Sequence, residues 1–121
     1  MTTGIIRTLP KIYADPNHEA CRNYRSMLSK LERDPMSDDC WFMACAQQPK
    51  RDFLHVYVLI NGLIEVRFNF VGFRDGFKSR LWDGVERHPK VWLICSAPVS
   101  RPPEPIQMRG FRGHRYTDDL W

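Results

Sequence analysis

The feature that most constrains this fold is a pair of apolar segments, residues 52–60 and 63–71, joined by Asn61-Gly62. Both segments are rich in β-branched and aromatic residues, which favour strands. An Asn-Gly pair favours the type I′ turn, whose positive φ angles match the twist of paired strands. The sequence therefore predicts an antiparallel hairpin in which Ile60 faces Leu63, Leu59 faces Ile64 and Tyr57 faces Val66. Opposed residues share a face, so the predicted core face comprises His55, Tyr57, Leu59, Ile64, Val66 and Phe68.

An amphipathic helix is predicted after a short first strand at residues 4–9. Asp15 is a good cap for the first backbone amides. Pro16 suits the first helical position, because the N–H that proline lacks would have no partner there. Apolar side chains then recur at helical spacing and form one stripe, which comprises Ala20, Tyr24, Met27, Leu28 and Leu31. The turn residues of segment 34–39 end this helix.

Further strands are predicted where short apolar runs are bounded by turn residues. Residues 40–46 predict a strand buried on both faces, and residues 90–97 predict another strand, which Pro98 ends. Residues 72–80 are predicted to form a basic loop, and residues 106–108 a short edge strand. Together these elements predict an α+β fold, a small curved or closed, mainly antiparallel β-barrel with one N-terminal α-helix packed on it.

The composition is that of a single domain over residues 1–121, with 43% hydrophobic residues to build a core. The sequence has neither an apolar run of about 18 residues nor a secretory signal, so we predict a cytoplasmic protein without a membrane partner. In that reducing compartment the four cysteines are predicted to be buried thiols. Cys40 and Cys45 have a loose metal-ligand spacing, but no second pair follows, so neither a metal nor a cofactor is predicted.

Two segments combine cations with aromatic rings and are the candidate binding sites. Guanidinium and ammonium groups pair with phosphates, flat rings stack on bases, and the net charge of +4 suits a polyanionic partner. The first segment contributes Arg74, Lys78, Arg80 and Trp82. The second contributes Arg109, Phe111, Arg112, His114, Arg115 and Tyr116. If the fold brings both segments together, they predict a cationic groove with stacking platforms. The alternative is that the arginines are ordinary surface residues and the barrel ends are filled by Phe73, Phe77, Trp82 and Phe111.

The later part of the sequence resembles a known superfamily. The Asn-Gly hairpin, the Trp-containing strand after it and the motif Pro-x-Pro-Ile-x-Met-Arg-Gly-Phe-Arg-Gly-x-Arg-Tyr at residues 103–116 are similar to the later part of PUA-like domains, which include the ASCH and EVE families. The resemblance covers roughly residues 53–117 and is most specific at residues 106–116. It implies a small barrel that holds RNA or an unusual nucleobase in a cleft beside the helix. The Gly-x-Lys-x-x-Glu-x-Arg element of an ASCH domain is missing, so no Lys/Glu/Thr catalytic set is carried over.

These observations predict a nucleic-acid-binding domain without catalysis, whose ligand is RNA or a modified or flipped nucleotide, and they leave RNA and DNA both open. A second hypothesis is a protein–protein interaction module, such as a virus- or prophage-encoded inhibitor of a host defence complex, because Trp, Arg and Tyr dominate interface hot spots. A third is a small nuclease or nucleobase hydrolase that uses His55 or His114 with a nearby carboxylate. The sequence has neither a nucleophile-elbow serine nor a Walker-type phosphate loop.

Overall fold

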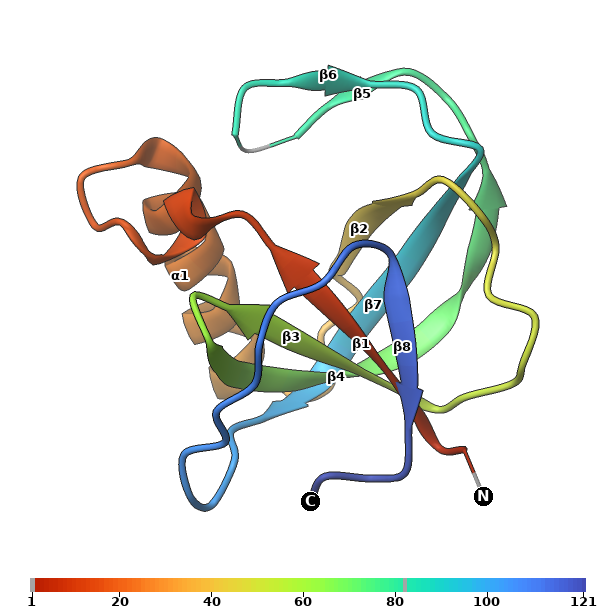
Figure 1. Cartoon of the computed structure of the whole chain (residues 1–121). Helices are drawn as coiled ribbons and strands as arrows, with labels where there is room; N and C mark the ends of the chain where they lie inside the picture. Colours follow the sequence, from red (N-terminus) through yellow and green to blue (C-terminus); the bar gives the residue numbers. More distant parts are fainter. Residues whose placement is uncertain (1, 82) are drawn as a thin grey trace.

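A curled sheet of six strands organises the molecule, for which a computed structural model describes residues 2–81 and 83–121 (Figure 1). The strand order is β2-β7-β4-β3-β1-β8, and every neighbouring pair is antiparallel except β1 and β3. The strands are β1 (Gly4–Leu9), β2 (Cys40–Cys45), β3 (His55–Ile60), β4 (Leu63–Asp75), β7 (Val91–Ser100) and β8 (His114–Thr117). A separate small hairpin, β5 (Ser79–Arg80) and β6 (Glu86–Arg87), arches over one end of the sheet (Figure 1).

The predicted α+β class and the curved, mainly antiparallel sheet are confirmed, but the sheet does not close into a barrel. Among the described residues, the outer strands β2 and β8 have one strand neighbour each, so a seam stays open between them. A side chain crosses this seam, because Nη2 of Arg7 on β1 donates a hydrogen bond of 2.6 Å to the carbonyl oxygen of Ala44 on β2. The result is a half-barrel whose open side exposes side chains from strands far apart in the sequence.

The Asn-Gly hairpin forms as predicted at its turn. Asn61 and Gly62 have φ angles of 49° and 84°, the left-handed values that a type I′ turn requires, and Ile60 pairs with Leu63. A β-bulge next to Leu59 then shifts the register, so that Tyr57 lies opposite Arg67 and not opposite Val66 as predicted. A bulge adds one residue to one strand and therefore exchanges the two faces beyond it.

The register shift makes the predicted core face wrong for two of its six residues. His55, Tyr57, Leu59 and Ile64 do share a face, but Val66 and Phe68 turn to the opposite, concave side and join the main core. Both faces of β3 are buried as a result. The concave side packs against the helix, and the outer side is covered by residues of the last segment, which are Ile106, Met108, Phe111, Leu120 and Trp121.

The helix α1 (Glu19–Arg33) begins later than predicted. The carboxylate of Asp15 accepts a hydrogen bond from the backbone N–H of Asn17 at 2.9 Å, which makes a local turn instead of a helix cap. The cap is His18, whose Nδ1 accepts the N–H of Ala20 at 3.0 Å. A short 3-10 helix, η1 (Lys11–Ala14), precedes this turn. The predicted apolar stripe is confirmed, since Ala20, Tyr24, Leu28 and Leu31 are buried and Met27 packs on the core.

Four further strand predictions need correction. Residues of β2 alternate between buried and less buried positions, so this strand is buried on one face only. Strand β7 continues past Pro98 instead of ending there. The pairing with β4 is interrupted at this residue, so the N–H group that proline lacks costs no hydrogen bond between the strands. Strand β4 extends to Asp75 through the predicted loop, and residues 106–108 form a single bridge to Leu63 instead of a strand. No helix among the described residues has the length and apolar character to cross a membrane.

Candidate nucleic-acid interface

Three hollows are joined by shared lining residues, of which two lie at the open seam of the half-barrel and the third lies beyond it, between residues 47–53 and strand β4. The arm pocket lies between β1, β2 and the arm, which we define as residues 76–88. The next one, here called the arginine hollow, is lined by Arg7, Ala46, Gln47, Arg112, Gly113 and His114, and it shares Arg7 with the arm pocket. The third, here called the loop hollow, is lined by residues 47–53, Phe70, Gly72, Phe73 and Lys90, and it shares Gln47 with the arginine hollow. Residues 46–54, here called the bridging loop, connect β2 to β3 and border the last two hollows.

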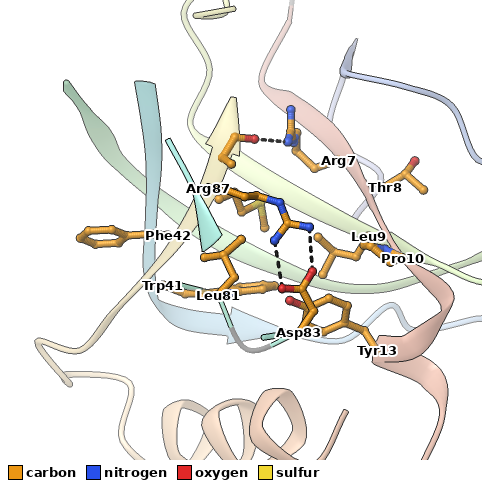
Figure 2. Close-up of a pocket in the computed structure, with 12 residues that line it drawn as sticks. Arg7, Thr8, Leu9, Pro10, Tyr13, Trp41, Phe42, Leu81, Asp83 and Arg87 are labelled. Atoms are coloured by element: carbon orange, nitrogen blue, oxygen red, sulfur yellow. Dashed lines mark hydrogen bonds and ion pairs between the residues drawn. The ribbon is translucent and has the colours of Figure 1, made fainter. Parts of the chain in front are cut away.

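The arm pocket is small, and Asp83 neutralises one of its two arginines, Arg87, whereas Arg7 has no carboxylate partner among the described residues (Figure 2). Its volume of about 150 Å³ matches a cavity that holds a single benzene-sized ring. Arg87 donates to both carboxylate oxygens of Asp83, at 3.0 and 2.7 Å, and the Asp83 side chain is only 5% exposed. The hydrogen bonds from Arg87 hold the pKa of Asp83 below its usual value. Burial, with the Asp83 charge beside it, raises the pKa of Tyr13 to about 12.

The loop hollow is larger and has an aromatic floor. Its volume of about 810 Å³ lies within the range of ligand-binding pockets, whereas the arm pocket is below that range. The floor is made by Phe53, Phe70 and Phe73, with ring centroids 4.3 Å apart for the first two and 5.1 Å apart for the last two. Phe70 and Phe73 are half-buried, so parts of their rings remain accessible at the bottom of this hollow.

Cations without carboxylate partners surround that floor. Lys50, Arg51 and Lys90 line the loop hollow and are exposed, and within residues 2–81 and 83–121 none of them makes an ion pair. The Arg51 guanidinium carbon lies 5.0 Å from the centre of the Tyr116 ring. Asp52 supplies a carboxylate to the same hollow, and the amides of Gln47 and Gln48 add neutral donors and acceptors. The hollow therefore carries a net positive charge that is available to a ligand.

Tyr116 fixes the position of the bridging loop. Its hydroxyl oxygen accepts the backbone N–H groups of Lys50 and Arg51, at 2.9 and 3.1 Å. Because Tyr116 is on β8, these two bonds tie the loop to the opposite edge strand of the sheet. They hold the cationic residues of the loop over the seam.

The arginine hollow is lined by Arg7, Ala46, Gln47, Arg112, Gly113 and His114, and contains no carboxylate among these residues. Arg7 and His114 are direct cross-strand partners, so their side chains project from the same face of β1 and β8. Burial, together with the positive charge of Arg7, lowers the pKa of His114. Its ring is therefore neutral at neutral pH and both donates and accepts hydrogen bonds.

The predicted residues of the first segment lie in or beside the arm. Arg74 is on β4, with its guanidinium carbon 6.0 Å from the centre of the Phe42 ring. Lys78 makes an ion pair with Glu86 at 3.4 Å, and Arg80 is exposed on β5. Trp82 lies outside the described residues. No described hollow is lined by Arg74, Lys78 or Arg80. None therefore combines these residues with those of the second segment.

The predicted residues of the second segment are divided between two faces of the sheet, because β8 alternates its side chains. His114 and Tyr116 point to the concave side, where they border the seam. Arg115 points to the outer side, and its guanidinium carbon lies 4.3 Å from the centre of the Phe111 ring. Arg109 lines a separate hollow at the Asn61-Gly62 turn. Arg112 lines the arginine hollow and so lies with His114 and Tyr116 at the seam. Arg109, Phe111 and Arg115 lie away from it.

Sequence reasoning missed Arg7, Gln47, Lys50, Arg51 and Lys90. The run Gln47-Gln48-Pro49-Lys50-Arg51 between two predicted strands was the available signal, because a polar, cationic loop beside aromatic strand residues has the composition of a binding loop. Arg7 and Lys90 gave no such signal, since each is a lone cation at the end of an apolar run.

A histidine–carboxylate pair is present, but it lies away from the seam hollows. Nδ1 of His55 is 2.8 Å from Oδ1 of Asp119, and the Tyr57 hydroxyl donates to the same oxygen at 3.0 Å. The hydrogen bond with His55 is the main cause of a lowered pKa at Asp119. The backbone N–H of Leu120 in turn donates to the Tyr57 oxygen at 2.9 Å. These bonds anchor residues 119–121 on the outer face of β3.

The cysteines are dispersed. Cys21, Cys45 and Cys95 are buried as predicted, whereas Cys40 is exposed at the start of β2. Burial raises the pKa of the Cys45 and Cys95 thiols. Among the described residues, no three His, Cys, Asp or Glu side chains are placed to hold a metal ion.

No family model, curated protein or solved structure matches this chain. The function of this chain is therefore inferred from the geometry of the hollows.

Proposed function

We propose that this chain binds single-stranded nucleic acid in the loop hollow and along the adjoining seam, without catalysing a reaction on it. The observation that carries the proposal is the ring of cations without ion-pair partners, Lys50, Arg51 and Lys90, around the floor made by Phe70 and Phe73. Cations that track a phosphate backbone beside accessible aromatic rings are the two components of single-strand recognition.

A single strand fits this surface better than a duplex. The aromatic floor is recessed inside the loop hollow, so only an unstacked base reaches it. RNA and DNA strands both present such bases, and the proposal covers either. The predicted PUA-like relationship stays part of this proposal, and the half-barrel is compatible with a partly open barrel of that kind.

Binding of fluorescent strands of about 12 nucleotides, measured by anisotropy, tests this function. We expect RNA or DNA single strands to bind more tightly than the matching duplex. With about three phosphate contacts, affinity is expected to fall about 20-fold between about 50 and about 200 mM salt. Affinity that does not change with salt would argue against phosphate contacts. Equal affinity for the duplex, or no binding to any strand, would overturn the proposal, and the absence of binding would favour the protein-interaction alternative.

A matched pair of phenylalanine variants tests the stacking part. Phe73→Leu keeps an apolar side chain but removes a ring face from the loop hollow, and we expect it to weaken binding about fivefold or more. Phe111→Leu is the control, because that ring is also half-buried but one face is already covered by Arg115. We expect the control to bind within about twofold of the unmodified protein, because no base is proposed to stack on Phe111. Equal losses in the two variants would contradict a stacking role for Phe73.

A further inference from the structure

The arginine hollow has the donors of an anion site. Arg7 comes from β1, Arg112 and His114 flank Gly113 just before and within β8, and Gln47 comes from the bridging loop. Two guanidiniums, one amide and one imidazole thus converge from three segments, and no carboxylate lines the same space. Guanidinium groups bind phosphoryl oxygens in pairs of charge-assisted hydrogen bonds, which makes phosphate the best-matched anion.

Arg7 is positioned in advance for such a ligand. One of its terminal nitrogens is fixed by the 2.6 Å hydrogen bond to the Ala44 oxygen, and the buried Nε has no partner among the described residues. A guanidinium has five N–H donors, so most of its capacity is unused. Gly113 has a φ angle of 75°, a left-handed conformation that suits glycine, and a Cβ added there would meet no atom within 4 Å. This turn leaves space between the side chains of Arg112 and His114.

The unpaired cations extend from the loop hollow to the open seam. They run from Lys90 and the bridging loop to the arginine hollow, which shares Gln47 with the loop hollow. The next space along the seam is the arm pocket, which shares Arg7 with the arginine hollow, but there Asp83 neutralises Arg87 and the volume of about 150 Å³ is below the range of ligand-binding pockets. A strand that follows the positive charge therefore ends at the arginine hollow. A terminal phosphate monoester carries a charge of about −1.5 to −2, whereas an internal diester carries less, so a site with two guanidiniums favours the terminal group.

We propose that the arginine hollow binds the terminal phosphate monoester of the nucleic-acid strand, through Arg7, Arg112, His114 and Gln47. This inference rests on the proposed function and adds the end of the strand as the recognised group. A mononucleoside monophosphate presents the same chemistry without the strand, so the experiment includes it as a separate ligand.

The test compares strands of one sequence that differ only in their ends, with a 5′-phosphate, a 3′-phosphate or hydroxyls alone. We expect one of the two phosphorylated strands to bind at least about fivefold more tightly than the hydroxyl-ended strand, in line with one added charge-assisted contact. The mononucleotide is expected to bind at least about tenfold more weakly than that strand, because it lacks the contacts to the loop hollow.

Variants assign the preference to the hollow. Arg112→Gln is expected to remove the preference for the phosphorylated strand, measured as the ratio of the two affinities, so that a loss shared by both strands cancels. Arg109→Gln is the matched control, since it removes a nearby arginine that lines a different hollow, and it should retain the preference. As a spectroscopic readout, the phosphorylated strand should raise the pKa of His114 in an NMR titration, and the hydroxyl-ended strand should not.

The outcomes separate the two proposals. Equal affinity for all three strands, or a preference that Arg112→Gln leaves intact, overturns the terminal-phosphate inference while strand binding itself remains supported. A mononucleotide that binds as tightly as the strand overturns the assignment to a strand end. If no strand binds at all, the proposed function fails first and the inference fails with it.

Discussion

The arm and the bridging loop are both cationic, but among the described residues carboxylates pair with two of the three Lys and Arg side chains of the arm and with neither of the two in the bridging loop. In the arm, Lys78 pairs with Glu86 at 3.4 Å, and Arg87 is held by both oxygens of Asp83. In the bridging loop, Lys50 and Arg51 have no such partners among the described residues. The number of cations in a segment is therefore a poor guide to a site that binds a polyanion. The carboxylates that the fold places beside those cations decide how much charge a ligand can use.

The largest expected effect comes from reversing charge in each region in turn. The double variant Lys50→Glu, Lys90→Glu should weaken single-strand binding about 100-fold, because two phosphate contacts become repulsive. The matched double variant Lys78→Glu, Arg80→Glu changes the net charge of the protein by the same amount. It should stay within about threefold of the unmodified protein, since only the long-range field changes. Anisotropy titrations at one salt concentration measure both variants.

The comparison between the two regions fails if the arm variant loses as much affinity as the loop variant. In that case net charge, and not the position of the unpaired cations, would control binding. Far-UV circular dichroism and thermal melts of both variants confirm that each remains folded.

A second prediction concerns the stability that the arm gains from its internal ion pair. Asp83→Asn should lower the free energy of unfolding by about 1–3 kcal/mol at neutral pH, because Arg87 loses the charge of a largely buried partner. The pKa of Asp83 is lowered in the folded state, so its stabilisation is present above the unfolded value of 3.8 and is lost as pH falls through the folded value. The difference between the two proteins should therefore shrink in acid.

Urea denaturation at neutral pH and below the pKa of Asp83 measures this difference. Glu86→Gln is the control, because it breaks the more exposed, longer pair with Lys78 and should change stability much less. A stability difference for Asp83→Asn that is independent of pH would contradict an electrostatic origin. Nucleic-acid affinity should be almost unchanged in both variants.

The smallest predicted effect concerns the attachment of the bridging loop to β8. Tyr116→Phe removes the acceptor of the Lys50 and Arg51 backbone N–H groups and should cost about 0.5–1.5 kcal/mol of stability. Amide hydrogen exchange of these two residues should become faster, and strand affinity should fall by about two- to fivefold as the loop loses order.

Tyr24→Phe is the matched control for the loss of a hydroxyl. The Tyr24 hydroxyl is buried without a hydrogen-bond partner among the described residues, so its removal should be neutral or slightly stabilising. If exchange at Lys50 and Arg51 stays slow in Tyr116→Phe, the hydroxyl does not hold the loop.

Local sequence signals predicted the elements of this fold better than their contacts. The Asn-Gly turn, the apolar stripe of the helix and the existence of the strands predicted at residues 4–9 and 90–97 follow from short-range patterns, and the structure confirms them, although the second strand continues to Ser100. The bulge beside Leu59 has no such pattern and reversed the faces assigned to Val66 and Phe68. The helix start moved because Asp15 satisfied a nearer N–H in a turn, a competition that propensity alone does not resolve.

The candidate site was harder to predict, because long-range contacts build it. Arg7 reaches Ala44 across 37 positions, and Tyr116 reaches Lys50 across 66. The last segment was recognised as basic and aromatic, but its pairing with β1 sends Arg115 and His114 to opposite faces. Periodicity shows this division only once the segment is known to be a strand, and its Gly-rich composition gave no reason to expect one.

The most direct test of the account is a map of backbone amide chemical shifts as a single strand of about 12 nucleotides is added to the isotopically labelled protein. The account predicts that the largest changes lie in residues 47–53 of the bridging loop and residues 112–116 beside the seam, with the arm, residues 76–88, nearly unchanged. Changes concentrated in the arm or on the outer face of α1 would contradict it.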